Sequence, residues 1–216
     1  MHLHREPKAH AEVSTQRIEA FSDGIFSIAI TLLVLEIKVP EFPDGGNGLA
    51  AKLLSLWPSY FGYVFSFVMI GIHWANHHYI FKLYERSDHN FLMLNIFYLM
   101  CISFLPFPTA VLARYIEVVA KQETVAVFYA FGLFLPAFAW LLMWLYASHN
   151  HRLLHPRLDA NFKRHLTRRY FLTNLFYLGA IALSFWHGLA GLGLCVGLTL
   201  LYILPTRPPV YTKPDE

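Results

Sequence analysis

Long apolar segments, separated by short polar connections, run through most of this chain. They lie near residues 17–39, 57–84, 90–113, 124–147, 169–187 and 189–204. Segments of this kind are typical of helices that cross a membrane, whose hydrocarbon core is about 30 Å thick. The pattern predicts an all-α membrane protein with six transmembrane helices in residues 17–205, flanked by an N-terminal tail at 1–16 and a C-terminal tail at 206–216.

The composition supports a membrane protein with several spans. Of the 216 residues, 56% are hydrophobic and only 14% are charged, whereas a soluble domain carries about a quarter charged residues. Cys101 and Cys195 fall inside apolar segments, which favours packing over a disulfide. Residues 1–16 have no apolar core, so we expect a poorly ordered tail and not a cleavable signal peptide.

The distribution of basic residues predicts the orientation of the chain in the membrane. With six spans, thirteen of the 17 Lys and Arg residues fall on the side of both termini and of the second and fourth connections. Cytoplasmic loops carry the excess of Lys and Arg. We therefore expect both termini in the cytoplasm and the protein in the cell membrane. With an odd number of spans, the Lys and Arg residues would no longer be separated onto one side of the membrane.

The first apolar segment has two lines of residues at helical spacing. Large apolar side chains repeat at intervals of four and three, which places them on one face: Phe21, Ile25, Ile28, Leu32, Leu35 and Val39. Beside them runs a line of small residues, which lets membrane helices approach closely: Ala20, Gly24, Ser27 and Thr31. In an assembly, the face with the large side chains can surround a shared axis while the face with the small residues packs against another helix. Pro40, Pro43 and residues 44–48 should end this helix.

Three charges stand within this apolar helix: Arg17, Asp23 and Glu36. Only twelve residues, about 18 Å of helix, lie between Asp23 and Glu36, so at least one acid is drawn towards the membrane, where it needs partners. Candidate donors for Asp23 lie at a similar depth on the first three spans: Ser22, Trp74, His77, His78 and Asn95. We expect Arg17 to bond across helices or to line the cytoplasmic mouth.

Three motifs resemble the transmembrane protein 175 family of potassium-conducting channels. They are Arg17-x-x-x-Phe21-Ser22-Asp23 with the apolar run to Leu35-Glu36, the second-span pattern His73-Trp74-x-x-His77-His78, and residues 103–109, SFLPFPT. The resemblance covers about residues 17–205, and the first motif is its most specific part.

The resemblance implies a homotetrameric, potassium-favouring channel with the first helix of each subunit around a central pore. By offset from Phe21-Ser22-Asp23, it places a pore constriction, or hydrophobic gate, at Ile28, Leu32 and Leu35, and a selectivity layer at Thr31. Rings of Ile or Leu close a pore by excluding water, and hydroxyls replace part of an ion's hydration shell. The filter sequence TVGYG is absent, so selectivity must come from elsewhere.

The polar residues of the second and third spans have a simpler interpretation as a supporting network. We expect His73, Trp74, His77, His78 and Asn95 to hold helices together or to assist gating at Asp23. His73 and His77 share a helical face, but no further ligands complete a metal site, so we predict neither metal nor cofactor. Thr31 has a structural alternative, a bond to its own helix, and the seam has one in ordinary packing inside a single subunit.

Residues 148–168 form the only long polar connection and carry four histidines, for which a pH-sensing role stays open. The basic residues 163, 164, 168 and 169 should anchor the fifth span to anionic headgroups.

Two other functions remain as alternatives: a proton-coupled transporter that uses Asp23 and His77, and a non-conducting membrane scaffold. No phosphate loop, elbow serine or carboxylate pair indicates an enzyme, and nothing indicates a nucleic-acid partner. The expected partners are potassium ions, the lipid bilayer and further copies of the chain.

Overall fold

The computed structural model describes residues 15–40, 48–116, 123–203 and 208–211. Within these residues the regular elements are helices, and two isolated β-bridges pair residues of the connecting segments. The helices are α1 (Thr15–Leu32), continued by the 3₁₀ turn η1 (Leu33–Glu36), α2 (Leu49–Ser55), α3 (Trp57–Phe81), α4 (His89–Phe104), α5 (Pro106–Arg114), α6 (Glu123–Ser148), the 3₁₀ turn η2 (His149–His151), α7 (Ala160–Ser184) and α8 (Gly188–Leu201).

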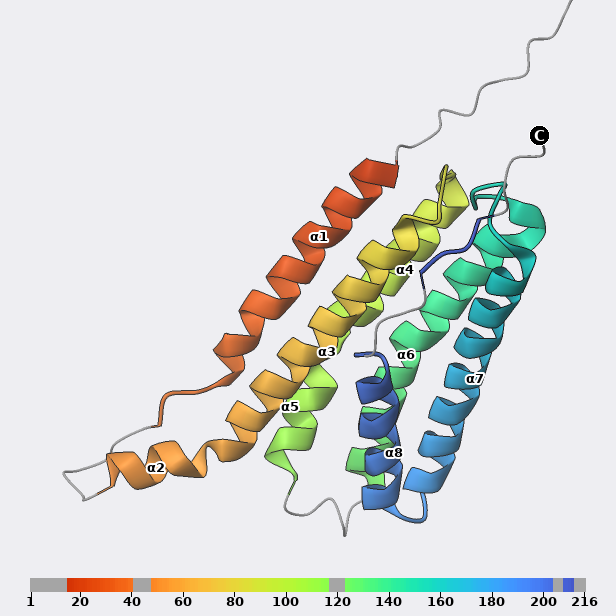
Figure 1. Ribbon diagram of the computed structural model, residues 1–216. Helices are drawn as coiled ribbons and strands as arrows, with labels where there is room; N and C mark the ends of the chain where they lie inside the picture. Colours follow the sequence, from red (N-terminus) through yellow and green to blue (C-terminus); the bar gives the residue numbers. More distant parts are fainter. Residues whose placement is uncertain (1–14, 41–47, 117–122, 204–207, 212–216) are drawn as a thin grey trace, which may run out of the picture.

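The long helices form a bundle with α1 at one edge and α7 at the other (Figure 1). α1 packs on α3 and α4, whereas α6 contacts α4, α7 and α8. The core lies between these helices and is rich in aromatic rings, among them Trp144, Tyr98, Tyr129 and Phe91. Since α1 has neighbours on one side only, its other side stays uncovered in the subunit.

Prolines interrupt two of the predicted long helices. Pro58 stands at the start of α3, which meets α2 at a bend of 45°. Pro106 follows Leu105 and starts α5, so the predicted third span divides there into α4 and α5. A proline lacks the N–H that would continue the helix and clashes with the preceding turn.

The number of spans stays a prediction. By length and apolar composition, three described helices qualify as membrane spans: Thr15–Glu36, His89–Arg114 and Glu123–His151. The bent pair α2 and α3 would make four. α7 is long enough but carries basic residues in its first half, and α8 is apolar but has only 14 residues.

Two boundary predictions were wrong. The first helix ends at Glu36, so Val39, 88% exposed, does not extend the helical seam. Residues 148–168 are not one long polar connection, because α7 already begins at Ala160. There the Asp159 carboxylate caps the helix by accepting from the Phe162 N–H at 2.8 Å. Leu153, Leu154 and Leu158 of this connection are buried.

Several predicted segments lie outside the described residues: all but the end of the N-terminal tail, residues 43–47 of the first connection, and most of the C-terminal tail. The described part of that last segment, residues 208–211, returns to the connection between α6 and α7. There the Asp159 N–H donates to the Val210 carbonyl, 2.9 Å away, and Tyr211 pairs with Leu158. The predicted packing role of the cysteines is confirmed, because Cys101 and Cys195 are buried and unpaired.

Candidate functional site: the uncovered face of α1

α1 divides into a buried and an uncovered face. Ile18, Ser22, Phe26, Ala29 and Leu33 recur at intervals of four and three and are buried against the rest of the subunit. This is the spacing of a single helical face.

The three predicted constriction residues lie on the other face. Ile28 is 59% exposed, Leu32 53% and Leu35 60%. An apolar stripe of this kind, left open by its own subunit, needs a partner, which in a membrane protein is lipid, another helix or a pore axis. The alternative in which these residues pack inside one subunit is therefore wrong.

Thr31, the predicted selectivity residue, is exposed on the same face. Its hydroxyl donates back to its own helix, with Oγ1 2.9 Å from the Ser27 carbonyl oxygen and 3.1 Å from that of Ile28. The hydroxyl proton is therefore engaged, whereas the oxygen lone pairs of Thr31 remain available as acceptors.

The predicted line of small residues is also uncovered. Ala20, Gly24, Ser27 and Thr31 are all exposed, and a Cβ added at Gly24 would meet no atom of the subunit within 4 Å. Beside the constriction residues, a groove of about 380 Å³ opens between α1 and the break from α4 to α5, with Ile28 and Leu32 on one wall and Ser103 and Pro106 on the other.

At the margin of this face, Asp23 has one hydrogen-bonding partner among the five predicted donors. The indole N–H of Trp74 on α3 donates to Asp23, with Nε1 2.8 Å from Oδ1. His78, one turn further along α3, stacks on the Trp74 ring at 6.2 Å between ring centres. Asp23, Trp74 and His78 are all exposed in the subunit.

Three other predicted residues form a separate, buried chain of hydrogen bonds. The Asn95 amide of α4 donates to the Ser22 hydroxyl at 3.1 Å, and Ser22 in turn donates to the Ile18 carbonyl at 2.8 Å. On its other side, Asn95 Oδ1 accepts from His77 Nε2 at 3.0 Å. The His77 ring stacks on Phe81 with 4.1 Å between centres. This chain joins α1, α3 and α4 through one amide.

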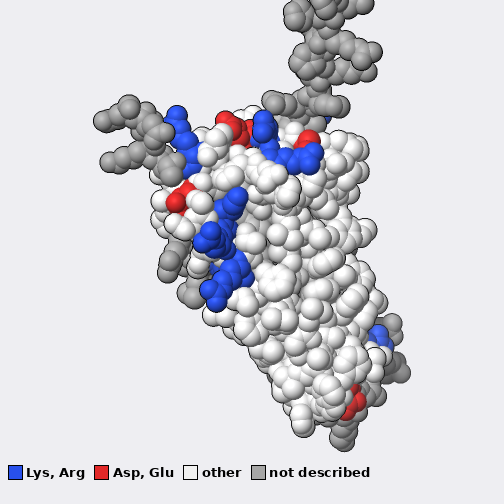
Figure 2. Space-filling model, turned by 90° about the vertical axis from the view of Figure 1, so that its right-hand side faces the viewer, with Lys and Arg blue, Asp and Glu red and all other residues white. Residues whose placement is uncertain are grey.

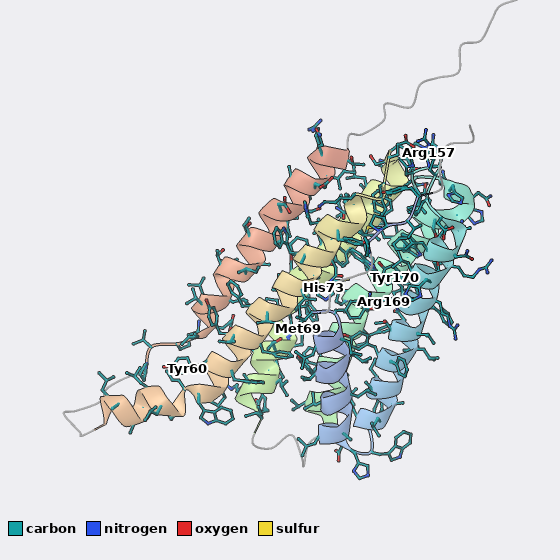
Figure 3. All side chains as sticks on the ribbon, in the orientation of Figure 1. Tyr60, Met69, His73, Arg157, Arg169 and Tyr170 are labelled. Carbon is teal, nitrogen blue, oxygen red and sulfur yellow. The ribbon has the colours of Figure 1, made fainter. Side chains whose placement is uncertain are left out.

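His73 does not join either group. Its Nδ1 hydrogen-bonds the Tyr98 hydroxyl, 3.1 Å away, and Tyr98 is fully buried. In Figure 3, His73 lies about halfway along the bundle, on α3. Among the described residues, no group of three or more His, Cys, Asp or Glu side chains is arranged to hold a metal ion.

Arg17 is exposed, and in the described part of the chain no hydrogen bond or ion pair joins its side chain to another residue. Both roles predicted for it, a bond across helices and a place at the cytoplasmic mouth, stay predictions.

Sequence reasoning missed Tyr98 and Phe26. Tyr98 follows Asn95 by three positions and so shares its helical face, a spacing that signals the role. Phe26 packs edge-on against both His77 and Tyr98, at 5.6 and 6.4 Å between ring centres. An apolar ring in an apolar segment carries no such signal.

Comparison with known proteins agrees with the resemblance seen in the motifs. Residues 17–106 match the family model described as endosomal/lysosomal potassium channel TMEM175. A protein of Chamaesiphon minutus named as a potassium channel is 43% identical over 91% of this chain and 97% of its own length.

A solved structure and an animal protein extend this comparison. The crystal structure of a lysosomal potassium-selective channel TMEM175 homologue from the same organism superimposes with a TM-score of 0.74 at 39% identity, over 88% of this chain and 96% of that one. A mouse protein named endosomal/lysosomal proton channel TMEM175 is 35% identical over 45% of this chain and 21% of its own length. Since the Chamaesiphon relative is 43% identical over 91% of this chain and 97% of its own length, this chain belongs to the TMEM175 family.

Proposed function

We propose that this protein is a potassium-favouring cation channel, in which ions move passively down their electrochemical gradient. Four subunits place their α1 helices around a central pore, and the other five spans, built from α2 to α8, form the scaffold. The observation that carries the proposal is the uncovered stripe of Ile28, Leu32 and Leu35, which its own subunit leaves open. We propose potassium as the ion because the similar proteins are named as potassium channels.

The chemistry of the stripe fits a gate that excludes water. From Ile28 to Leu35 the stripe extends for about 10 Å along the helix. Repeated around an axis, its three aliphatic side chains make rings that exclude water, through which a hydrated ion passes only when the pore widens or wets. Thr31 lies within this length and offers its oxygen towards a dehydrating ion, which supports its role as the selectivity layer.

Assembly and topology are part of the same proposal. Six spans, with α2 and α3 as one bent span and α4 and α5 as another, keep both termini on the strongly basic, cytoplasmic side of the cell membrane. The exposed line from Ala20 to Thr31 and the groove beside Ile28 would receive the neighbouring subunit. The hydrogen-bonded chain through Asn95 then holds α1 in place from behind.

Recording in planar bilayers, with potassium and sodium on opposite sides, tests this function. Unitary currents with a reversal potential displaced towards the potassium equilibrium are expected. Ile28→Asn and Leu35→Asn should raise leak or conductance, because a polar ring wets more easily. Leu175→Asn is the matched control, since Leu175 is equally exposed at 55% but lies on α7. Unchanged currents in both α1 variants would exclude these residues from the gate.

A second function, proton-coupled transport through Asp23 and His77, stays open because animal relatives are named proton channels. The partners of the two residues do not favour it: Asp23 is bonded to Trp74 and His77 to Asn95. The same bilayers decide between the two, because a transporter shows saturable, pH-driven flux without unitary steps.

A further inference from the structure

Four basic residues, which we name the α7 basic column, occupy the first half of α7: Lys163, Arg164, Arg168 and Arg169. Arg164 and Arg168 are one helical turn apart and exposed, and the other two are half-buried. Figure 2 shows the face on which α7 lies, where blue side chains descend from the charged end towards the middle of an otherwise white surface. α7 itself contains no acidic residue.

In the part of the chain that the structure describes, no acidic side chain forms an ion pair with this column. In the described part of the chain, the ion pair found is the one between Arg152 and Asp88, in the neighbouring connections. The nearest acid in sequence, Asp159, is occupied as the helix cap. Arg169 places its guanidinium over the Tyr202 ring, 4.7 Å from the centre, which holds the charge in position without neutralising it.

The apolar parts of α7 and α8 are shorter than the hydrocarbon core of an ordinary bilayer. Beyond Arg169, the apolar part of α7, residues 170–184, is only about 22 Å long, and α8 with its 14 residues is about 21 Å. Both fall short of a hydrocarbon core of about 30 Å. In Figure 3, Arg169 lies at about the level of His73, halfway along the bundle, whereas Arg157 lies at its upper end.

The side chains that follow the column face outwards. Phe171 is 60% exposed, Leu175 55% and Phe176 52%. α7 also lies at the edge of the bundle opposite α1 (Figure 1), so a pore around α1 leaves it on the lipid-facing perimeter. The basic column, which has no acidic partner among the described residues, is therefore followed directly along α7 by an apolar surface that suits acyl chains.

We infer that the α7 basic column binds the phosphate headgroups of anionic lipids and draws them inwards, which thins the leaflet beside α7. Guanidinium groups bind phosphate oxygens with two parallel hydrogen bonds. A headgroup drawn down to Arg168 relieves the mismatch between the short apolar length of α7 and α8 and the bilayer. Phe171 and Leu175 contact the acyl chains below it. This inference requires the protein in a membrane but no ion conduction.

Native mass spectrometry of the protein, released from nanodiscs of equal phosphatidylcholine and phosphatidylglycerol, tests the column. The unmodified protein should retain phosphatidylglycerol in preference to phosphatidylcholine. In Arg164→Gln/Arg168→Gln the preference should fall about 25-fold, since each basic residue near an anionic surface contributes roughly a fivefold factor. Lys52→Gln/Arg114→Gln removes the same amount of charge from α2 and α5, at the opposite end of the bundle. This control variant should keep the preference for phosphatidylglycerol.

Arg164→Lys/Arg168→Lys keeps the charge and should keep most of the preference. Equal retention of both lipids by the unmodified protein would overturn the inference, as would full preference in the Gln pair or equal loss in the control pair. Potassium flux, measured in parallel in vesicles of the same lipids, separates this result from the proposed function, because lipid retention does not depend on conduction.

Discussion

Trp74 on α3 donates its indole N–H to the Asp23 carboxylate on α1, with 2.8 Å between Nε1 and Oδ1. This bond lies at the margin of the uncovered face, whereas the chain from Ser22 through Asn95 to His77 lies on the buried side of the same helix turn. α1 is thus tied to the scaffold from both sides at one level, while the stripe from Ile28 to Leu35 stays free of polar contacts to the scaffold.

Asp23 serves α1 as a hydrogen-bond acceptor, so an amide should partly replace it. Asp23→Asn keeps an oxygen that accepts from Trp74, whereas Asp23→Leu does not. We expect Asp23→Leu to cost about 1 kcal/mol, less than a buried charged bond because both side chains are exposed in the subunit, and Asp23→Asn to cost less. Thermal unfolding in detergent measures this. Trp74→Phe combined with Asp23→Leu should cost no more than either change alone; full additivity would mean that the two are not coupled.

Asn95 is the centre of the buried chain, and its removal should be more costly. Asn95→Leu leaves His77 Nε2 without its acceptor in an apolar interior, at a cost of about 1–3 kcal/mol. Unfolding in detergent should shift clearly for this variant. The matched change Asn161→Leu, at an exposed position in the first turn of α7, should shift little. Equal shifts in the two would show that added apolar surface, and not the chain, is responsible.

Thr31 should affect selectivity without affecting stability. Its hydroxyl bonds only to carbonyls of its own helix, which already accept helical hydrogen bonds, so Thr31→Val should change the free energy of unfolding by less than about 0.5 kcal/mol. In the proposed channel it should reduce the preference for potassium over sodium, seen as a shift of reversal potential. Thr124→Val, exposed at the start of α6, should leave both unchanged. A Thr31→Val channel with unaltered selectivity would remove the hydroxyl layer from the proposal.

Gly24 tests assembly apart from folding. Within the subunit, a Cβ at Gly24 or at Gly193 meets no atom within 4 Å, so Leu at either position should be tolerated by the isolated fold. Because small residues allow close approach of membrane helices, Gly24→Leu should reduce the tetramer fraction, measured by light scattering or cross-linking in mild detergent. Gly193→Leu, on α8, should not. An intact tetramer in Gly24→Leu would place the subunit contact elsewhere.

Asp88 should make stability depend on acid pH. Burial alone would raise the pKa of this carboxyl, but bonds from the Phe91 N–H and the Tyr146 hydroxyl, with the nearby charge of Arg152, outweigh it, and the pKa is lowered. A lowered folded pKa gives stability that is complete above the unfolded value, about 3.9, and is lost as the pH falls through the folded pKa.

The thermal midpoint, measured between pH 6 and pH 3, checks this dependence. Asp88→Asn still caps α4 but does not titrate, so its midpoint should fall less steeply below about pH 4. Asp159→Asn makes the same change at the cap of α7 and is the control variant for the loss of a capping carboxylate. The same acid slope in Asp88→Asn and in the unmodified protein would assign that slope to other carboxyls.

The sequence by itself determined the helical class and the face of α1 that carries Ile28, Leu32 and Leu35. Both follow from short-range rules: apolar length, and the 3.6-residue period that fixes which side chains share a face. The candidates for the polar network were also visible, because Asp23, Trp74, His77 and Asn95 are polar residues in apolar segments, where unpaired polar groups are costly.

Only the tertiary structure decided how these candidates pair. Depth along a span does not define how one helix is rotated against another, so the sequence could not rank the five candidate donors for Asp23. The packing of the helices pairs Asp23 with Trp74 and His73 with Tyr98. It also places Asn95 between Ser22 and His77. It also decided that the face with Ile28 is the uncovered one, since periodicity defines a face but not its partner. Which face of α1 is covered depends on where α3 and α4 pack, and this packing is set by contacts between residues 50 to 75 positions apart in the sequence.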